Sequence, residues 1–286
     1  MVDLRKKSAI WKSRFKIATL FASSLSLLVT TEILLSQRPA HAQVNLYPLV
    51  LQEETERGQA RAVINVANTS DQPFRARITA EPFTYTQADG FTTLEPGSSG
   101  DLTPYLFFSP TELVVPPNSE RRIRMITQFP PSAEPGEYRA VIFTEPLRAT
   151  SPEDGTPGVN VITRVAATLY VRNGDLSPEI VVGSALWDRE AQQVQMVVDN
   201  VGEASVRPVA QWTLRQGDMI IALGQSCPTA IMPESKRNFL LDYSTQEVPI
   251  LPSGTYELSG EFVWRDGSDD EQTQSFEVEL QIPVGN

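Results

Sequence analysis

The chain has 286 residues, with 24 Lys plus Arg against 35 Asp plus Glu, one His and one Cys. This length suits an export signal followed by two domains of ordinary size. The one histidine, His41, lies in the segment that we expect to be removed, and a chain without imidazole has no Ser-His-Asp triad, Cys-His dyad or His-ligated zinc site. Carboxylates are too numerous for counting to exclude a glycosidase pair, but no nucleophile motif is present. We therefore expect a protein that is not an enzyme and that uses no metal and no cofactor.

The first 42 residues have the organisation of a signal peptide. A basic head ends at Lys16, an uncharged run covers 17–31, and Ala40-His41-Ala42 supplies the small-x-small pattern before a cleavage site. The competing interpretation is an uncleaved anchor, but the apolar run is short for a bilayer span and Glu32 ends it. We expect cleavage after Ala42, with no membrane span afterwards.

Cleavage would make the protein strongly acidic. Seven basic and two acidic residues leave with 1–42, so 17 basic and 33 acidic residues remain and the net charge becomes −16. Nucleic acid and anionic lipid would repel such a chain, so neither is an expected partner. Cys227 has no second cysteine to pair with, and we expect it to be a small buried apolar residue without a redox role.

Alternation with period two dominates the chain after residue 43. It is clear in 62–66, 74–81 and 123–129, and 140–143 is apolar on both faces, as in a central strand. Seven such segments, separated by turn residues, fit between Val44 and Arg172. The pattern predicts an antiparallel β-sandwich.

Arginine supplies all eleven bases of residues 43–174, against 15 acidic residues. Five of them fall on the polar phase of their strands, so we expect several to stand side by side on one solvated sheet face: Arg75, Arg77, Arg122, Arg124 and Arg139. Either this face binds carboxylates, which suit the planar guanidinium fork, or nearby Glu residues neutralise it in solvent.

A second all-β block follows Asn173-Gly174, a pair that interrupts a strand. We therefore divide the mature chain into domains 43–172 and 173–286. Alternation returns in 194–198, 256–264 and 276–282, which predicts a second sandwich of similar size. The segment 266–271, Asp-Gly-Ser-Asp-Asp-Glu, lacks the full spacing of a calcium loop and is better explained as a hairpin turn.

The order of five pieces in 44–172 resembles the periplasmic chaperones that assemble pili. These pieces are the first strand at 44–46, the second at 60–68, the proline turn and strand through 108–124, the strand 136–146 that ends in Glu-Pro, and the strand 161–172. The resemblance implies two immunoglobulin-like domains, a periplasmic location and a protein subunit as partner.

The resemblance also implies a mechanism in which the last strand of the first domain is added to the open edge of an incomplete subunit. The candidate donor strand is 159–165, and its apolar face carries Val159, Val161, Thr163 and Val165. The alternative is that this strand is an internal member of the sandwich, and the sequence leaves both open. It also leaves open self-association through an edge strand.

One departure from the family concerns the client's carboxylate. The resemblance implies a cleft Arg and Lys as its anchors, and the corresponding positions here hold Val50 and Thr168. Arg164, on the same strand face as Thr168, is the candidate substitute. Glu137 and Arg172 match family positions for charges near the domain junction, and we expect them to be structural, as an ion pair.

A different functional class also fits the pattern. Two-domain immunoglobulin-like proteins of the cell envelope serve as adaptors or structural surface-binding proteins, and they bind folded partners rather than incomplete ones. A chaperone should be soluble on its own and capture denatured or incomplete subunits, whereas an adaptor should co-purify with a stable complex.

Overall fold

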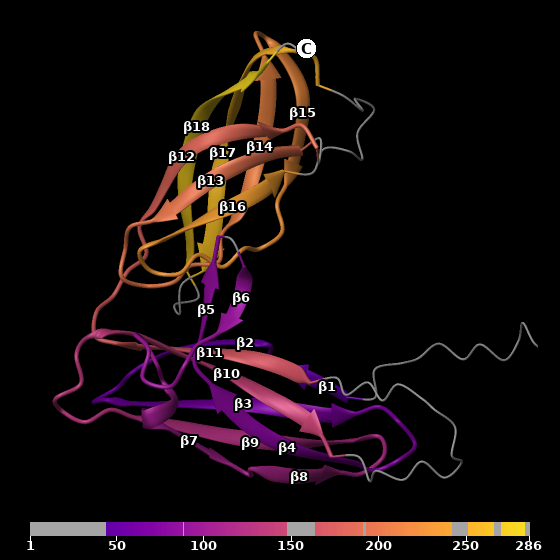
Figure 1. The fold of residues 1–286 in the computed structure, drawn as a ribbon, viewed down its shortest axis with the longest axis vertical. Helices are drawn as coiled ribbons and strands as arrows, with labels where there is room; N and C mark the ends of the chain where they lie inside the picture. Colours follow the sequence, from indigo (N-terminus) through magenta and orange to yellow (C-terminus); the bar gives the residue numbers. More distant parts are fainter. Residues whose placement is uncertain are drawn as a thin grey trace, which may run out of the picture. The chain divides into compact units, whose positions relative to one another are not determined.

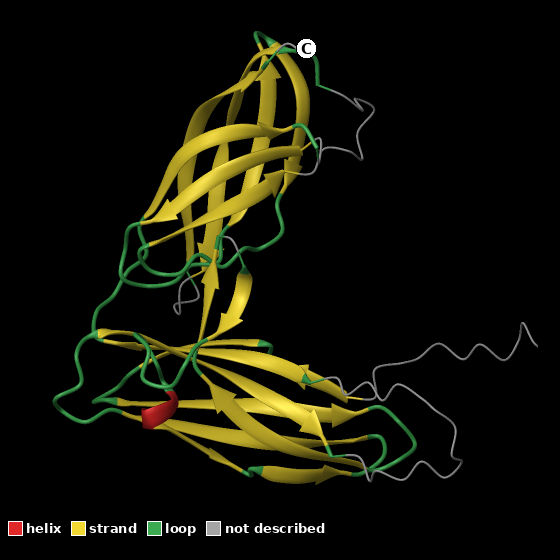
Figure 2. Ribbon diagram, in the orientation of Figure 1, coloured by secondary structure: helices red, strands yellow, loops and turns green. Residues whose placement is uncertain are grey.

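A computed structural model describes residues 44–87, 89–147, 164–190, 193–241, 251–265 and 270–283. These belong to one compact unit, Val44–Asn286, whose strands run from β1 to β18 (Figure 1). In the described ranges the one helical element is the short 3-10 turn Thr103–Tyr105 (Figure 2). No helix in these ranges has the length and apolar character needed to cross a membrane.

The first sandwich consists of two sheets, with strand orders β1-β3-β9-β7 and β2-β11-β10-β4-β8. Their strands are β1 (Val44–Tyr47), β2 (Val50–Glu54), β3 (Gln59–Asn68), β4 (Phe74–Glu81), β7 (Leu106–Ser109), β8 (Glu112–Val115), β9 (Ser119–Gln128), β10 (Gly136–Pro146) and β11 (Val165–Asn173). Period-two alternation gives each strand one buried face, as along β3, where every second residue is buried. The core between the sheets includes Ile64, Ile123 and Val171.

The second sandwich also has two sheets, with strand orders β12-β13-β16 and β15-β14-β17-β18. Their strands are β12 (Ile180–Asp188), β13 (Gln193–Asn200), β14 (Val209–Gln216), β15 (Met219–Gln225), β16 (Ser235–Leu241), β17 (Gly254–Arg265) and β18 (Glu271–Ile282). Its core is a separate cluster that includes Trp212, Phe239 and Phe262.

A small hairpin, β5 (Phe83–Thr86) with β6 (Gly90–Thr93), follows β4 and forms a sheet of its own. Its Phe83 belongs to a third apolar cluster, which joins residues of β10 and β11 to residues that precede β16. The members of this cluster are Phe83, Val141, Phe143, Tyr170, Ala230 and Met232. Beyond the cluster, Gln87 Nε2 donates to Asn238 Oδ1 at 2.8 Å, and Arg237 donates to the Thr86 carbonyl. The hairpin therefore contacts β16 directly.

The predicted fold class, an all-β protein of two immunoglobulin-like β-sandwiches, is confirmed. Two details differ from the prediction. The first block contains eleven strands rather than seven segments, because the chain adds a hairpin and several four-residue strands. One pair, β2 with β11, is parallel, an arrangement that a tight hairpin cannot connect and that the long chain between these two strands allows.

The prediction for the five arginines was only partly right, because they divide between two sheets instead of sharing one face. Arg75 and Arg77 lie on β4 in the five-stranded sheet, whereas Arg122 and Arg124 lie on β9 in the other sheet. Arg139, on β10, has a side chain that is only 12% exposed. Period two fixes the face of a strand on which a residue lies, but it does not say to which of two sheets the strand belongs.

The prediction for Cys227 was wrong, because this residue is exposed. It lies in the connection that follows β15, outside any strand, where no core face is available to cover it. At the hairpin of β17 and β18, Arg265 pairs with Glu271 across the turn. Residues 266–269 of that turn are outside the described residues. The division into domains at 172 and 173 stays a prediction, with β11 ending at Asn173 and β12 beginning at Ile180.

Candidate functional site: the open edge of strand β11

How much of the β11 edge is covered depends on where the chain passes from one sheet to the other, between β1 and β2. β1 pairs with β3 in the four-stranded sheet as far as Tyr47, and β2 pairs with β11 in the five-stranded sheet from Val50 onward. The first Cα pair between β2 and β11 is Val50 with Thr168, and the last is Glu54 with Arg172. β2 therefore covers only the later part of β11 (Figure 1).

The beginning of β11 is paired on one side. Along β10 the ladder is continuous, from Asn173 opposite Gly136 to Val165 opposite Thr144. On the side of β2, the Thr168 N–H donates to the Leu49 carbonyl at 2.8 Å, and no strand in the described part of the chain pairs with Val165, Ala166 or Ala167 there. This stretch of β11 is an open strand edge.

Strand alternation identifies the backbone groups that point out of this edge. The N–H of Thr168 and the carbonyl of Arg172 both bond towards β2, the latter to the N–H of Thr55 at 2.9 Å. Successive residues of a strand point their N–H and C=O to opposite sides, so the groups of Ala166 point the same way as those of Thr168. In the described residues, Ala166 thus offers one donor and one acceptor to an added strand.

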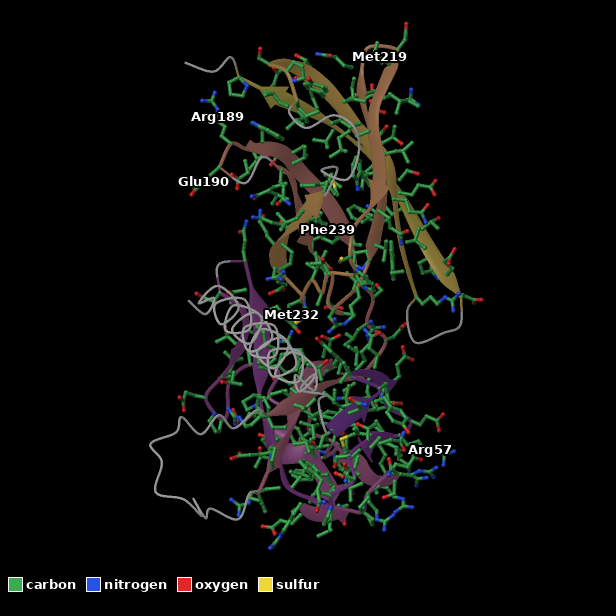
Figure 3. All side chains as sticks on the ribbon, turned by 90° about the vertical axis from the view of Figure 1, so that its right-hand side faces the viewer. Arg57, Arg189, Glu190, Met219, Met232 and Phe239 are labelled. Carbon is green, nitrogen blue, oxygen red and sulfur yellow. The ribbon has the colours of Figure 1, made fainter. Side chains whose placement is uncertain are left out.

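Apolar side chains lie on both faces of the open edge. Val165 packs against the core of the first sandwich, to which Ala167 belongs. Ala166 packs against the third apolar cluster, whose Met232 is labelled in Figure 3. A strand added at this edge would continue both surfaces, which is the arrangement needed for strand addition.

Of the predicted donor face, only Val165 is described, and it is the first residue of β11. Val159, Val161 and Thr163 are outside the described residues. Arg164, the proposed substitute anchor, places its guanidinium 4.4 Å from the centre of the Phe143 ring and its Nη1 3.6 Å from Glu81 Oε1. An incoming carboxylate would therefore compete with Glu81 for Arg164.

The two positions at which the resemblance implies anchors are brought together but are uncharged. Val50 and Thr168 form the first Cα pair between β2 and β11. Val50 is 37% exposed, whereas Thr168 is buried and its hydroxyl donates to the Leu49 carbonyl at 3.3 Å. Neither side chain can neutralise a carboxylate, so binding here would depend on the backbone and on apolar contact.

Glu137 and Arg172 also lie together, as opposite residues of β10 and β11. Arg172 Nε is 3.7 Å from Glu137 Oε2, and the Glu137 side chain is completely buried. The same oxygen accepts hydrogen bonds from the N–H and the hydroxyl of Ser205, both at 2.8 Å. Arg172 Nη2 donates to the Ser205 carbonyl at 3.0 Å. The pair thus contacts a residue that lies between β13 and β14.

Sequence reasoning missed two members of this charged cluster. Arg139 Nη1 is 3.9 Å from Glu137 Oε1, so the buried carboxylate lies between two guanidinium groups. Arg139 is two residues from Glu137 and so shares its strand face, a signal that was present in the sequence. Nothing in the sequence pointed to Ser205, because its contact depends on how the second sandwich folds.

A small hollow lies where β2 meets β11. It has a volume of about 130 Å³ and is lined by Gln52, Glu53, Glu54, Tyr170 and Arg172. Burial raises the pKa of the Glu53 carboxyl. Pockets for drug-sized ligands usually start at about 300 Å³, so this hollow is too small for one.

Tyr170 is almost fully buried beside this hollow, and it supports a test of the site's packing. Burial raises the pKa of Tyr170 to about 12, from the usual 10.0. Its hydroxyl accepts a hydrogen bond from Arg207 Nη2 at 2.6 Å. Because the folded-state pKa is raised, the linked stability is fully present below about pH 10 and is lost as the pH rises towards about 12.

We therefore expect the wild-type protein to lose about 2 kcal/mol more unfolding free energy between about pH 10 and pH 12 than Tyr170→Phe does. Urea unfolding at several alkaline pH values measures this difference. The variant also lacks the hydrogen bond from Arg207, which lowers its unfolding free energy by about 1 kcal/mol. This loss is a constant offset, and the test compares how steeply the unfolding free energy of each protein falls with pH. Identical slopes for the two proteins would show that Tyr170 is not buried as described.

No protein-family model matches the chain. No curated protein matches it either. Solved structures similar to it include the class 5 fimbriae chaperone CfaA, with 14% identity, a TM-score of 0.48, and coverage of 84% of this chain and 100% of that chain. A chain of the CsuC-CsuE chaperone-tip adhesion subunit complex of Acinetobacter baumannii has 13% identity and a TM-score of 0.48, with coverage of 85% and 100%. The E. coli chaperone DraB has 13% identity and a TM-score of 0.45, with coverage of 83% and 96%.

Proposed function

We propose that this protein is an exported, periplasmic chaperone-like protein that binds pilus or surface subunits by β-strand addition. The observation that carries the proposal is the open edge of β11 at Val165–Ala167. There β10 pairs with β11 on one side, and on the other side pairing with β2 starts only at Thr168. An unpaired edge presents free N–H and C=O groups, which readily pair with another chain. The predicted signal peptide, 1–42, supports the periplasmic location.

Binding at this edge would combine two contributions. The backbone of Ala166 supplies hydrogen bonds worth about 1 kcal/mol each, and the segment 159–165 would add alternating valines, each worth about 1.5–3 kcal/mol when buried. The client would be an incomplete β-protein that lacks a strand. Glu137, Arg172 and Ser205 would hold the first sandwich against the second, and Arg164 would meet the client's charged end after leaving Glu81.

Hydrogen exchange of single amides tests the open edge. In the free protein we expect the Ala166 amide to exchange at least about 100-fold faster than those of Ala167 and Thr168, which are hydrogen-bonded within the sheet. When a strand-deficient subunit is bound, the Ala166 amide should slow to the level of its neighbours. If Ala166 were already as protected as Thr168 in the free protein, the edge would be occupied and the proposal would fail.

Capture from a periplasmic extract separates the proposed chaperone from the alternative, an envelope adaptor. The chaperone should be isolated without a partner and should bind a denatured or strand-deficient subunit but not the completed one. An adaptor should be isolated in a stable complex with a folded protein. Preferential binding of the completed subunit would therefore favour the adaptor.

A further inference from the structure

The outer face of the sheet β1-β3-β9-β7 carries three arginines among exposed apolar side chains. Register places Arg124 opposite Val63, and Arg61 opposite Ile126, with Arg122 two residues before Arg124 on the same face. Val63, Ile126 and Phe107 are 40%, 44% and 63% exposed. We call this surface the arginine face, defined by Arg61, Arg122, Arg124, Val63, Ile126 and Phe107.

The three arginines have no carboxylate partner within the part of the chain that the structure describes. The acidic residue on this face, Glu120, accepts a hydrogen bond from the Tyr47 hydroxyl. The contrast is with Arg75 and Arg77, which share Glu112 at 2.8 and 3.3 Å. The arginine face therefore holds a local positive charge and apolar area that its own sandwich does not cover.

The second sandwich has a sheet face of the opposite charge. On the outer face of β17 and β18, Glu257 lies directly opposite Glu279, with Glu277 and Glu261 nearby on the same face. Arg215 of β14 lies opposite Glu257 on its other side, so this face carries four carboxylates against one guanidinium in these positions. Like charges directly opposite each other on neighbouring strands are unfavourable. Along the same sheet, β15 adds Ile220, which is 49% exposed. We call this surface the glutamate face, defined by Glu257, Glu261, Glu277, Glu279 and Ile220.

We infer that the arginine face of one copy of this chain docks against the glutamate face of a second copy. The two surfaces are opposite in charge, both belong to four-stranded sheets, and each has exposed apolar side chains. Contact would place guanidinium forks on carboxylates, the pairing that arginine favours, and would relieve the repulsion between Glu257 and Glu279. The contact is heterologous, so a pair of copies keeps one free arginine face on one copy and one free glutamate face on the other, and the assembly can extend.

The size of the arginine face makes this a weak contact. The central strands β3 and β9 have 10 residues each and the edge strands β1 and β7 have four each, which gives a face of about 450 Å². Two such faces bury about 900 Å² in total, which is in the range of weak, transient interfaces. We therefore expect association in the micromolar range that weakens as salt screens the charges.

Sedimentation velocity on the full mature chain tests the inference, with Cys227 kept reduced because it is exposed. In about 50 mM salt the wild type should self-associate, and its association constant should fall at least about tenfold in about 0.5 M salt. Reversing either face alone, as Arg122→Glu with Arg124→Glu or as Glu257→Arg with Glu279→Arg, should lower the constant by at least about tenfold.

Charge exchange provides the decisive control. The chain with both faces reversed should regain self-association, and an equimolar mixture of the two single-face variants should form heteromeric complexes. Ala166→Pro, at the open edge of β11, should associate like the wild type, so failure of the proposed chaperone function and failure of this inference give different results. Thermal melts of each variant verify folding, since all four substitutions are at exposed positions.

Two results would overturn the inference. The first is a wild type that stays monomeric at about 0.5 mM protein in low salt, well above a micromolar dissociation constant. The second is a chain with both faces reversed that does not regain association. An anionic membrane is the alternative partner of the arginine face. Vesicles with one part phosphatidylglycerol to about three parts phosphatidylcholine test it. If a monomeric wild type sediments with these vesicles and the variant Arg122→Glu with Arg124→Glu does not, the arginine face binds anionic membranes instead.

Discussion

Replacing Glu137 with Leu is expected to lower the free energy of unfolding by about 3–5 kcal/mol. The Glu137 side chain is completely buried, and those of Arg139 and Arg172 are 12% and 7% exposed. Without the carboxylate, two buried guanidinium groups would face each other, and the N–H and hydroxyl of Ser205 would lose their acceptor. Urea unfolding followed by far-ultraviolet circular dichroism measures the loss.

Tryptophan fluorescence adds a readout that is specific to the second sandwich. Trp187, Trp212 and Trp264 all lie on strands of that sandwich, and no tryptophan occurs between residues 44 and 173. Because Glu137 is on β10 and bonds to Ser205, its loss should uncouple the two sandwiches, so the fluorescence transition should separate from the dichroism transition.

Glu112→Leu is the matched control for this prediction. Glu112 also contacts two arginines, Arg75 and Arg77, but all three side chains are well exposed to solvent. Exposed ion pairs contribute about 0–1 kcal/mol, so this variant should unfold almost as the wild type does. If Glu137→Leu were no more destabilising than Glu112→Leu, the buried cluster would not hold the sandwiches together.

The all-β fold was predictable because period-two alternation is a local property of the sequence. Along β3 and β13 the buried residues fall on every second position, as the apolar pattern indicates. Each such strand needs one covered face, so two packed sheets follow from burial alone. The positions of Glu137 and Arg172 could likewise be placed near each other, but only by way of the family resemblance.

The structure of the open edge was less accessible from sequence. It depends on the change of sheet between Tyr47 and Val50, which decides how far β2 covers β11. No local pattern encodes the sheet that a strand joins, because alternation is the same in either. The same ambiguity led to the wrong grouping of Arg75 with Arg122, which lie on different sheets.

Two buried asparagines show how a turn residue can be recognised without its role being visible. Asn68 and Asn200, at the ends of β3 and β13, are 2% and 0% exposed. Asn68 Nδ2 donates to the Val115 carbonyl at 3.0 Å, and Asn200 Nδ2 donates to the Ala204 carbonyl at 2.8 Å. Asparagine is typical of turns, but composition does not reveal these bonds, and the Val115 carbonyl is brought near Asn68 only by the folded chain.

Ala166 is the position at which the open edge can be altered with least effect on the sandwich. Its N–H points away from β10, so proline there would remove no bond of the β10–β11 ladder. Proline is tolerated on strand edges, and it favours an extended conformation at the residue before it, here Val165, which is already in β11. Ala167 differs, because its N–H belongs to the β10 side and proline would break the ladder.

Ala166→Pro is therefore expected to weaken binding of a strand-deficient subunit between about tenfold and about 100-fold while leaving the fold intact. The client's carbonyl would lose its donor and be buried without a partner, at a cost of about 1–3 kcal/mol. Ala166→Ser, which keeps the N–H and is close in size, should bind as the wild type does. Titration calorimetry with the same subunit measures all three affinities, and thermal melts show whether the variants are folded. A folded Ala166→Pro that binds with wild-type affinity would mean that the client does not add its strand to β11 at this residue, and that the exposed edge has no part in recognition.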